Sequence, residues 1–147
     1  MDLVDANVLL YAVNLDARHH ERSRRWLDES LSGGEPVAFA WLALLAFLRL
    51  STKVDLFPRP LTTEQALDRV EGWLRTPAAV VLEPTPDHGR ILRRLLLEVG
   101  AAANLVNDAH LAALAIEHRC GIVSFDADFK RFRGVSCREP EPSRSAP

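Results

Sequence analysis

Apolar residues along this chain follow two alternating patterns. Short, mainly apolar runs of the kind that form strands buried on both faces lie at 3–4, 37–40, 79–82 and 122–125. Apolar residues at helical spacing occupy the segments between them, at 8–15, 17–31, 41–51, 62–76, 85–100 and 105–119. The alternation predicts an α/β fold in three layers, with a mostly parallel sheet of four strands, or five if 135–138 joins it.

Local signals predict where several of these elements begin. Thr62 and Gln65 have the spacing of a capping box, in which each side chain bonds the other residue's backbone N–H. Thr85 followed by Pro86 predicts a helix with proline at its first position. We expect one globular domain over 1–139, because 147 residues suit a single core, and a disordered proline- and serine-rich tail over 140–147.

Composition restricts the classes of protein to consider. With 48% hydrophobic and 26% charged residues, the chain has an ordinary soluble composition. The longest apolar run, 37–48, is too short for the roughly 20 residues of a membrane-spanning helix, and the amino terminus lacks a secretory pattern. The two cysteines, Cys120 and Cys137, form no CxxC pair. We therefore expect a cytoplasmic protein with no membrane partner.

Four aspartates are predicted to meet at one edge of the sheet. Asp5 ends the first strand, and Asp126 and Asp128 follow the strand at 122–125. Asp108 lies in the first turn of a helix that runs antiparallel to that strand, so it reaches the same edge. In such folds ligands bind at the carboxyl ends of the strands. This edge is therefore where we expect the chemistry.

Each aspartate also has an ordinary explanation. Asp108 is favoured by the helix dipole, and Asp5 and Asp126 suit turns after strands. Together, however, these charges would repel one another unless a cation neutralised them. A hard ion with oxygen ligands, Mg²⁺ with Mn²⁺ as a substitute, fits better than zinc, because the five histidines show no HxxxH or HExxH spacing.

Three segments resemble the best-recognised blocks of the PIN-domain ribonucleases, and among them the VapC-type toxins of bacterial toxin–antitoxin pairs. The segments are "LVDANVLLYA", "NLVNDAHLAALAIEH" and "GIVSFDADFKRF", in the same order and at similar intervals. The resemblance implies a PIN-like domain with a metal pocket of Asp5, Asp108 and Asp126, with Asp128 as a further catalytic residue. It also implies supporting roles for Asn7 and Ser124. For these two, a helix cap and an unremarkable strand residue remain alternatives.

One position departs from the resemblance. Many PIN domains carry a glutamate in the helix after the second strand, whereas "WLALLAFLRL" contains no acid and Ala46 stands at the expected position. The number of metal ions therefore stays open, and so does a non-catalytic PIN-like module that binds RNA or protein. Aspartyl-phosphate phosphatases are disfavoured because Asn7 occupies the position of their second aspartate.

A ribonuclease of this kind would hydrolyse RNA phosphodiester bonds with a metal-activated water. With a net charge of −2, the chain needs a local basic patch to hold RNA. The predicted candidates are Arg18, Arg22, Arg24 and Arg25, although an ordinary solvated helix face paired with Glu21, Asp28 and Glu29 also explains them. A second, weaker cluster is Lys130, Arg131 and Arg133. The resemblance further implies a homodimer and a VapB-type antitoxin that covers the acidic site.

Overall fold

A five-stranded sheet forms the centre of the protein, which is described by a computed structural model over residues 1–100 and 103–142. The strand order is β3-β2-β1-β4-β5, and each neighbouring pair is parallel. The strands are β1 (Asp2–Val4), β2 (Val37–Phe39), β3 (Ala79–Val81), β4 (Gly121–Val123) and β5 (Cys137–Arg138). The predicted parallel sheet is confirmed, with the fifth strand present.

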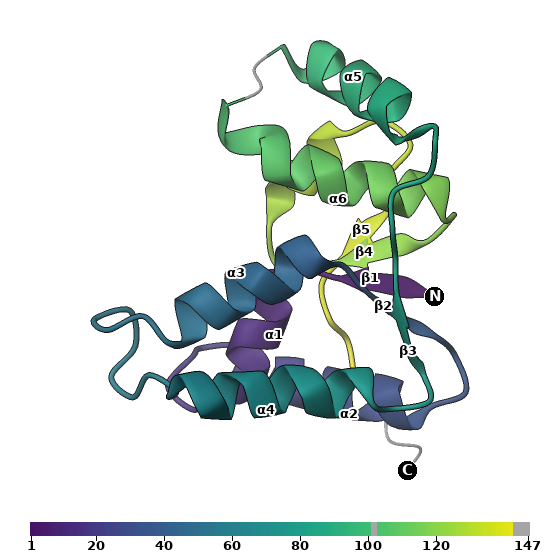
Figure 1. The fold of residues 1–147 in the computed structure, drawn as a ribbon. Helices are drawn as coiled ribbons and strands as arrows, with labels where there is room; N and C mark the ends of the chain where they lie inside the picture. The colour runs from purple at the N-terminus through teal and green to yellow at the C-terminus, as the bar shows by residue number, and fades with distance from the viewer. Residues whose placement is uncertain (101–102, 143–147) are drawn as a thin grey trace.

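Helices cover both faces of this sheet (Figure 1). One face carries α5 (His88–Val99) and α6 (Val106–Glu117), and the other carries α1 (Ala6–Val13), α2 (His20–Ser32), α3 (Trp41–Ser51) and α4 (Thr63–Leu74). Two short 3-10 helices, η1 (Ala103–Leu105) and η2 (Ala127–Arg131), precede α6 and follow β4. The expected three-layer α/β/α arrangement is confirmed.

The strand side chains divide between two cores because successive residues point to opposite faces of a sheet. Leu3 and Ile122 pack with α5 and α6, whereas Val4 and Val123 pack with the four helices of the other face. All four side chains are at most 1% exposed. Burial on both faces is the reason these strands read as continuous apolar runs.

The element ends agree with the local signals at one helix and differ at another. Thr62 caps α4 with the predicted capping box, in which the Gln65 N–H donates to Thr62 Oγ1 at 3.1 Å and the Thr62 N–H to Gln65 Oε1 at 2.9 Å. The predicted helix start at Thr85 and Pro86 is wrong, since α5 begins at His88. Thr85 instead donates its N–H and its hydroxyl to Glu117 of α6, at 2.9 and 2.6 Å.

The chain beyond β5 lies against α2. Pro140 is buried, and its carbonyl accepts a hydrogen bond from Arg22 Nε at 2.6 Å. Of the predicted tail, positions 143–147 lie outside the described residues. Within the described part of the chain, every helix is too short or too polar to cross a bilayer.

Candidate metal centre

Asp5 lies at the junction between β1 and α1, close to the middle of the sheet. Its N–H donates to the Val123 carbonyl at 3.0 Å, which continues the pairing of β1 with β4. Asp5 is the N-cap of α1, and its Oδ1 accepts the Ala6 N–H at 2.7 Å. Strand pairing and helix capping together fix this carboxylate at the carboxyl edge of the sheet.

Ser124, which follows β4, and Asn7, in the first turn of α1, both hydrogen-bond the Asp5 side chain. The Ser124 hydroxyl donates to Asp5 Oδ2 at 2.6 Å, and the Asn7 amide donates to the same oxygen at 3.2 Å. Ser124 Oγ also accepts from the Asp126 N–H at 2.9 Å, and Asn7 Oδ1 accepts from the Phe125 N–H at 3.2 Å. Since Asp5 is the cap of α1, the helix-cap alternative for Asn7 is wrong. Ser124 and Asn7 link the two loops that carry Asp5 and Asp126.

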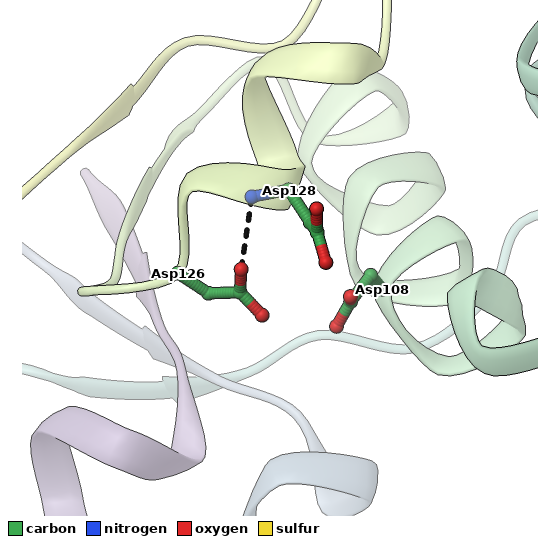
Figure 2. Close-up of side chains that lie close together, drawn as sticks. All are labelled: Asp108, Asp126 and Asp128. Atoms are coloured by element: carbon green, nitrogen blue, oxygen red, sulfur yellow. Dashed lines mark hydrogen bonds between the residues drawn. The ribbon is translucent and has the colours of Figure 1, made fainter.

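Three other carboxylates, those of Asp108, Asp126 and Asp128, converge at this edge (Figure 2). One oxygen each of Asp108, Asp126 and Asp128 lies within 4.8 Å of the other two. Asp108 projects from the first turn of α6, while the other two belong to the turn that opens η2. The Asp126 carboxylate accepts the Asp128 N–H at 2.8 Å, which sets the relative positions of the pair.

The electrostatics of this cluster disfavour three simultaneous negative charges. Burial raises the pKa of Asp108 to about 6, and the neighbouring charges of Asp126, Asp5 and Asp128 contribute to the rise. Burial also raises the pKa of Asp5, against the hydrogen bonds from Ser124 and Ala6 that favour its ionised form. A bound cation would reverse both effects, because it stabilises the ionised carboxylates.

The four predicted aspartates therefore lie at one edge of the sheet, but they divide into two sets. Asp108, Asp126 and Asp128 form the convergent group, whereas Asp5 lies beside it with both oxygens engaged in hydrogen bonds. The ligand set expected from the resemblance was Asp5, Asp108 and Asp126. The helix that carries Ala46, α3, contributes no acidic residue.

The arginines expected to bind RNA have different surroundings. Arg24 pairs with Glu21 and Asp28, and Arg25 with Glu29, as in the solvated-face alternative. Arg22 holds the Glu139 carboxylate at 2.8 Å and the Pro140 carbonyl. Arg18 is exposed and makes no ion pair with any residue in the described ranges. Of the second cluster, Arg131 lies 4.0 Å from Asp128.

An aromatic cluster that no sequence pattern indicated includes the residue between Ser124 and Asp126. Phe125, between Ser124 and Asp126, stacks on His19 with ring centroids 4.4 Å apart, and Tyr11 contacts both rings. No periodicity relates positions 11, 19 and 125, so this contact depends on the tertiary fold. A groove of about 790 Å³ lies elsewhere, between α2 and α4, and includes none of the clustered aspartates.

Fold and site together define a parallel α/β/α domain with an acidic, metal-type centre at the carboxyl ends of its strands. A model of the PIN domain matches residues 3–135. Ribonuclease VapC37 of Mycobacterium tuberculosis is 61% identical over 140 residues, which is 95% of this chain and 97% of the relative. Ribonuclease VapC31 of the same species is 39% identical over 135 residues, or 92% of this chain and 95% of the relative.

This chain therefore belongs to the PIN-domain family, within its VapC branch. Solved structures show the same fold. Mycobacterium tuberculosis VapC20, described as a Sarcin-Ricin loop cleaving toxin, has a TM-score of 0.68 at 17% identity, with 92% of this chain and 99% of that chain covered. VapBC2 from Rickettsia felis, bound to a promoter DNA fragment, has a TM-score of 0.67 at 16% identity, with 93% and 96% covered.

Proposed function

We propose that this protein is a Mg²⁺-dependent endoribonuclease, the toxin of a toxin–antitoxin pair. The observation that carries the proposal is the convergence of Asp108, Asp126 and Asp128 at the carboxyl edge of a PIN-domain sheet. Relatives that match nearly the whole chain are named ribonucleases, which supports RNA as the substrate.

The donor set suits a hard divalent ion. Each of the three clustered residues offers a carboxylate oxygen, and no histidine or cysteine belongs to the group among the described residues. Mg²⁺ prefers such oxygens and keeps several waters, and Mn²⁺ accepts the same ligands. We assign Asp108, Asp126 and Asp128 as the residues that hold the ion, with Asp5 as the adjacent fourth carboxylate.

The chain's own groups prepare the site for phosphodiester hydrolysis. When bound, Mg²⁺ would lower the pKa of a coordinated water and neutralise charge at the phosphate during in-line attack. Ser124 and Asn7 fix the carboxylate of Asp5, and the Asp128 N–H fixes that of Asp126. The acids are thus positioned before substrate arrives, and no protein nucleophile is needed.

An RNA cleavage assay with and without EDTA tests this function. We expect cleavage by the wild type in Mg²⁺ and its loss in Asp108→Asn, because one ligand oxygen loses its charge. Asp87→Asn is the matched control, since Asp87 is exposed and pairs only with Arg90 in the described part of the chain. Full activity of Asp108→Asn would contradict the proposal. RNA binding by the wild type without cleavage would favour the non-catalytic module.

We further propose a VapB-type antitoxin and a second copy of this chain as protein partners. Solved structures similar to this chain include FitAcB from Neisseria gonorrhoeae, FitAB bound to a DNA fragment, and VapBC2 from Rickettsia felis. Trp41 and Leu45, one turn apart on α3, are 46% and 57% exposed and offer apolar area for an interface. Size-exclusion chromatography with light scattering, alone and after co-expression with an adjacent small reading frame, measures both associations.

A further inference from the structure

Three aromatic side chains from separate segments meet next to the carboxylate cluster. Phe125 stacks on His19 with 11° between the ring planes. Tyr11 of α1 approaches Phe125 at 5.5 Å and His19 at 6.1 Å between centroids, at tilted angles. Phe125 directly precedes Asp126 in the chain, and both residues line one surface hollow of about 240 Å³, which places the stack beside the centre that we assign to phosphate chemistry.

The backbone of this stack is held by the same groups that hold the acidic centre. The Phe125 N–H donates to Asn7 Oδ1 at 3.2 Å, and the Asn7 amide donates to Asp5. The ring of His20, the residue after His19, bonds the Tyr11 carbonyl at 2.8 Å, which fixes the start of α2 against α1. Asn7 therefore connects the backbone of the aromatic stack to the Asp5 carboxylate.

The His19 ring has capacity left for a ligand. His19 is the half-buried N-cap residue of α2, but its ring makes no capping hydrogen bond, and the ring nitrogens bond no residue in the described ranges. Phe125 is already engaged, because Arg22 lies over its ring at 5.6 Å from the centroid and His19 stacks on it. Apart from the tilted contact with Tyr11, the His19 ring has no further ring contact among the described residues, so its face opposite Phe125 is the stacking surface that remains.

Positive charge suited to a nucleic-acid backbone lies beside this surface. Arg18 directly precedes His19, is exposed, and has no ion-pair partner in the described part of the chain. By contrast, the guanidinium of Arg22 is committed to Glu139 and Pro140. Arg18 is thus the arginine of this segment best placed to meet a phosphate.

We propose that the His19–Phe125 stack is the platform for one unpaired base next to the scissile phosphate of RNA, and that Arg18 contacts the backbone there. This inference rests on the proposed ribonuclease function and deepens it. Proteins recognise single-stranded RNA largely by stacking splayed bases on aromatic rings, including histidine, with arginine nearby. A base within a duplex exposes no free face to such a ring, so the platform selects an unpaired nucleotide.

The test uses a short RNA that the wild type cleaves, together with versions that lack one base on either side of the cut. We expect His19→Ala to raise KM for the intact RNA about tenfold with little change in kcat, and His19→Phe to restore it. Removing the base that stacks on His19 should raise the wild-type KM similarly, and should not raise that of His19→Ala further. Leu15→Ala, exposed in the same segment, is the control and should leave KM unchanged.

Two outcomes would overturn the platform. An unchanged KM in His19→Ala would do so, and so would equal effects of base removal on wild type and variant. If the wild type cleaves no RNA, the proposed function fails and the platform is tested by binding instead. The intact and base-deleted RNAs are then bound to Asp108→Asn and to Asp108→Asn/His19→Ala, and the two sets of affinities are compared. Thermal melting of each variant checks that a changed KM does not come from loss of folding.

Discussion

Asp108 shows most directly how a single carboxyl group is adapted at this site. The first turn of a helix favours an acid, but here burial and three neighbouring aspartates raise its pKa to about 6. The ionised form is therefore disfavoured by the protein itself and favoured by a bound cation. Such groups commonly lower stability in return for function.

Replacing Asp108 by asparagine should stabilise the metal-free protein at pH 7. The folded pKa of about 6 exceeds the ordinary value of 3.8, so the wild type loses stability as the pH rises through this window. Asparagine removes that loss. We expect the variant to gain ~1 kcal/mol of folding free energy in EDTA, a value kept small because solvent screens this half-exposed group. The gain should fade as the pH falls toward 4. Thermal melting of both proteins at pH 7 and pH 4 measures this gain. A lower melting temperature for the variant than for the wild type at pH 7 would contradict the expectation.

The Ser124 hydroxyl connects the two acidic loops. It is 2% exposed, donates to Asp5 and accepts the Asp126 N–H. Ser124→Ala should lower cleavage about 10- to 100-fold, as loss of a supporting hydrogen bond does at metal sites, and cost ~1–2 kcal/mol of stability. Single-turnover cleavage and urea unfolding measure the two effects. Ser136→Ala, at an exposed serine, is the control; equal activities of the two variants would exclude this role.

At the scale of elements, α6 carries Asp108 and is connected to α5 through a buried polar network. Glu117 is 1% exposed at its side chain and accepts from Thr85 and from His88 Nδ1, at 2.5 Å to the latter. His88 Nε2 lies 3.0 Å from His110 Nδ1, two residues beyond Asp108. The network fixes α6 against α5 and so helps to set the position of the Asp108 turn.

Glu117→Gln should destabilise the domain by ~1–3 kcal/mol at neutral pH, because the buried network loses its negative charge and one of its two acceptor oxygens. Burial raises the pKa of Glu117, but the hydrogen bonds from Thr85 and His88 outweigh it and leave the pKa below its ordinary 4.5. Its stabilisation is therefore present above that value and is lost as the pH falls through the folded pKa. Urea unfolding of both proteins at pH 7 and pH 3.5 should show the difference shrinking; a constant difference would argue against an ionised Glu117.

At the scale of the whole molecule, the acidic centre is assembled from three parts of the chain on a sheet with two cores. Asp5 follows β1, Asp108 begins α6, and Asp126 and Asp128 follow β4. These parts are held together because β1 and β4 are paired and buried on both faces, and α6 packs on the sheet through one of the two cores. A ligand that binds the centre should therefore stabilise the entire domain.

Mg²⁺ should accordingly raise the melting temperature of the wild type. A ligand at 100 times its Kd stabilises the folded state by about 2.7 kcal/mol, and binding here also removes carboxylate repulsion. Asp108→Asn should respond less, whereas Asp87→Asn should respond as the wild type does. Differential scanning calorimetry against Mg²⁺ concentration, with Na⁺ at matched ionic strength, makes the comparison. Equal shifts in all three proteins would indicate that Mg²⁺ binds elsewhere.

Much of the fold could be predicted because its causes are local. Apolar runs and helical spacing indicated the strands and helices, and Thr62 and Gln65 marked a real capping box. The start of α5 could not be predicted, because Thr85 bonds Glu117 on another helix and leaves Pro86 in a turn. Local sequence signals do not include hydrogen bonds to residues far away in the chain.

For the site, the sequence by itself determined that four aspartates reach one edge, since parallel strands end together and α6 begins where they end. Only the tertiary structure decided which oxygens converge: Asp128 joins Asp108 and Asp126, while Ser124, Asn7 and Ala6 engage Asp5. It also decided that Arg18 forms no ion pair within residues 1–100 and 103–142, and that Phe125 stacks on His19. The physical reason is that periodicity sets the side of an element on which a residue lies. The direction of its side chain depends on contacts with residues far away in the chain.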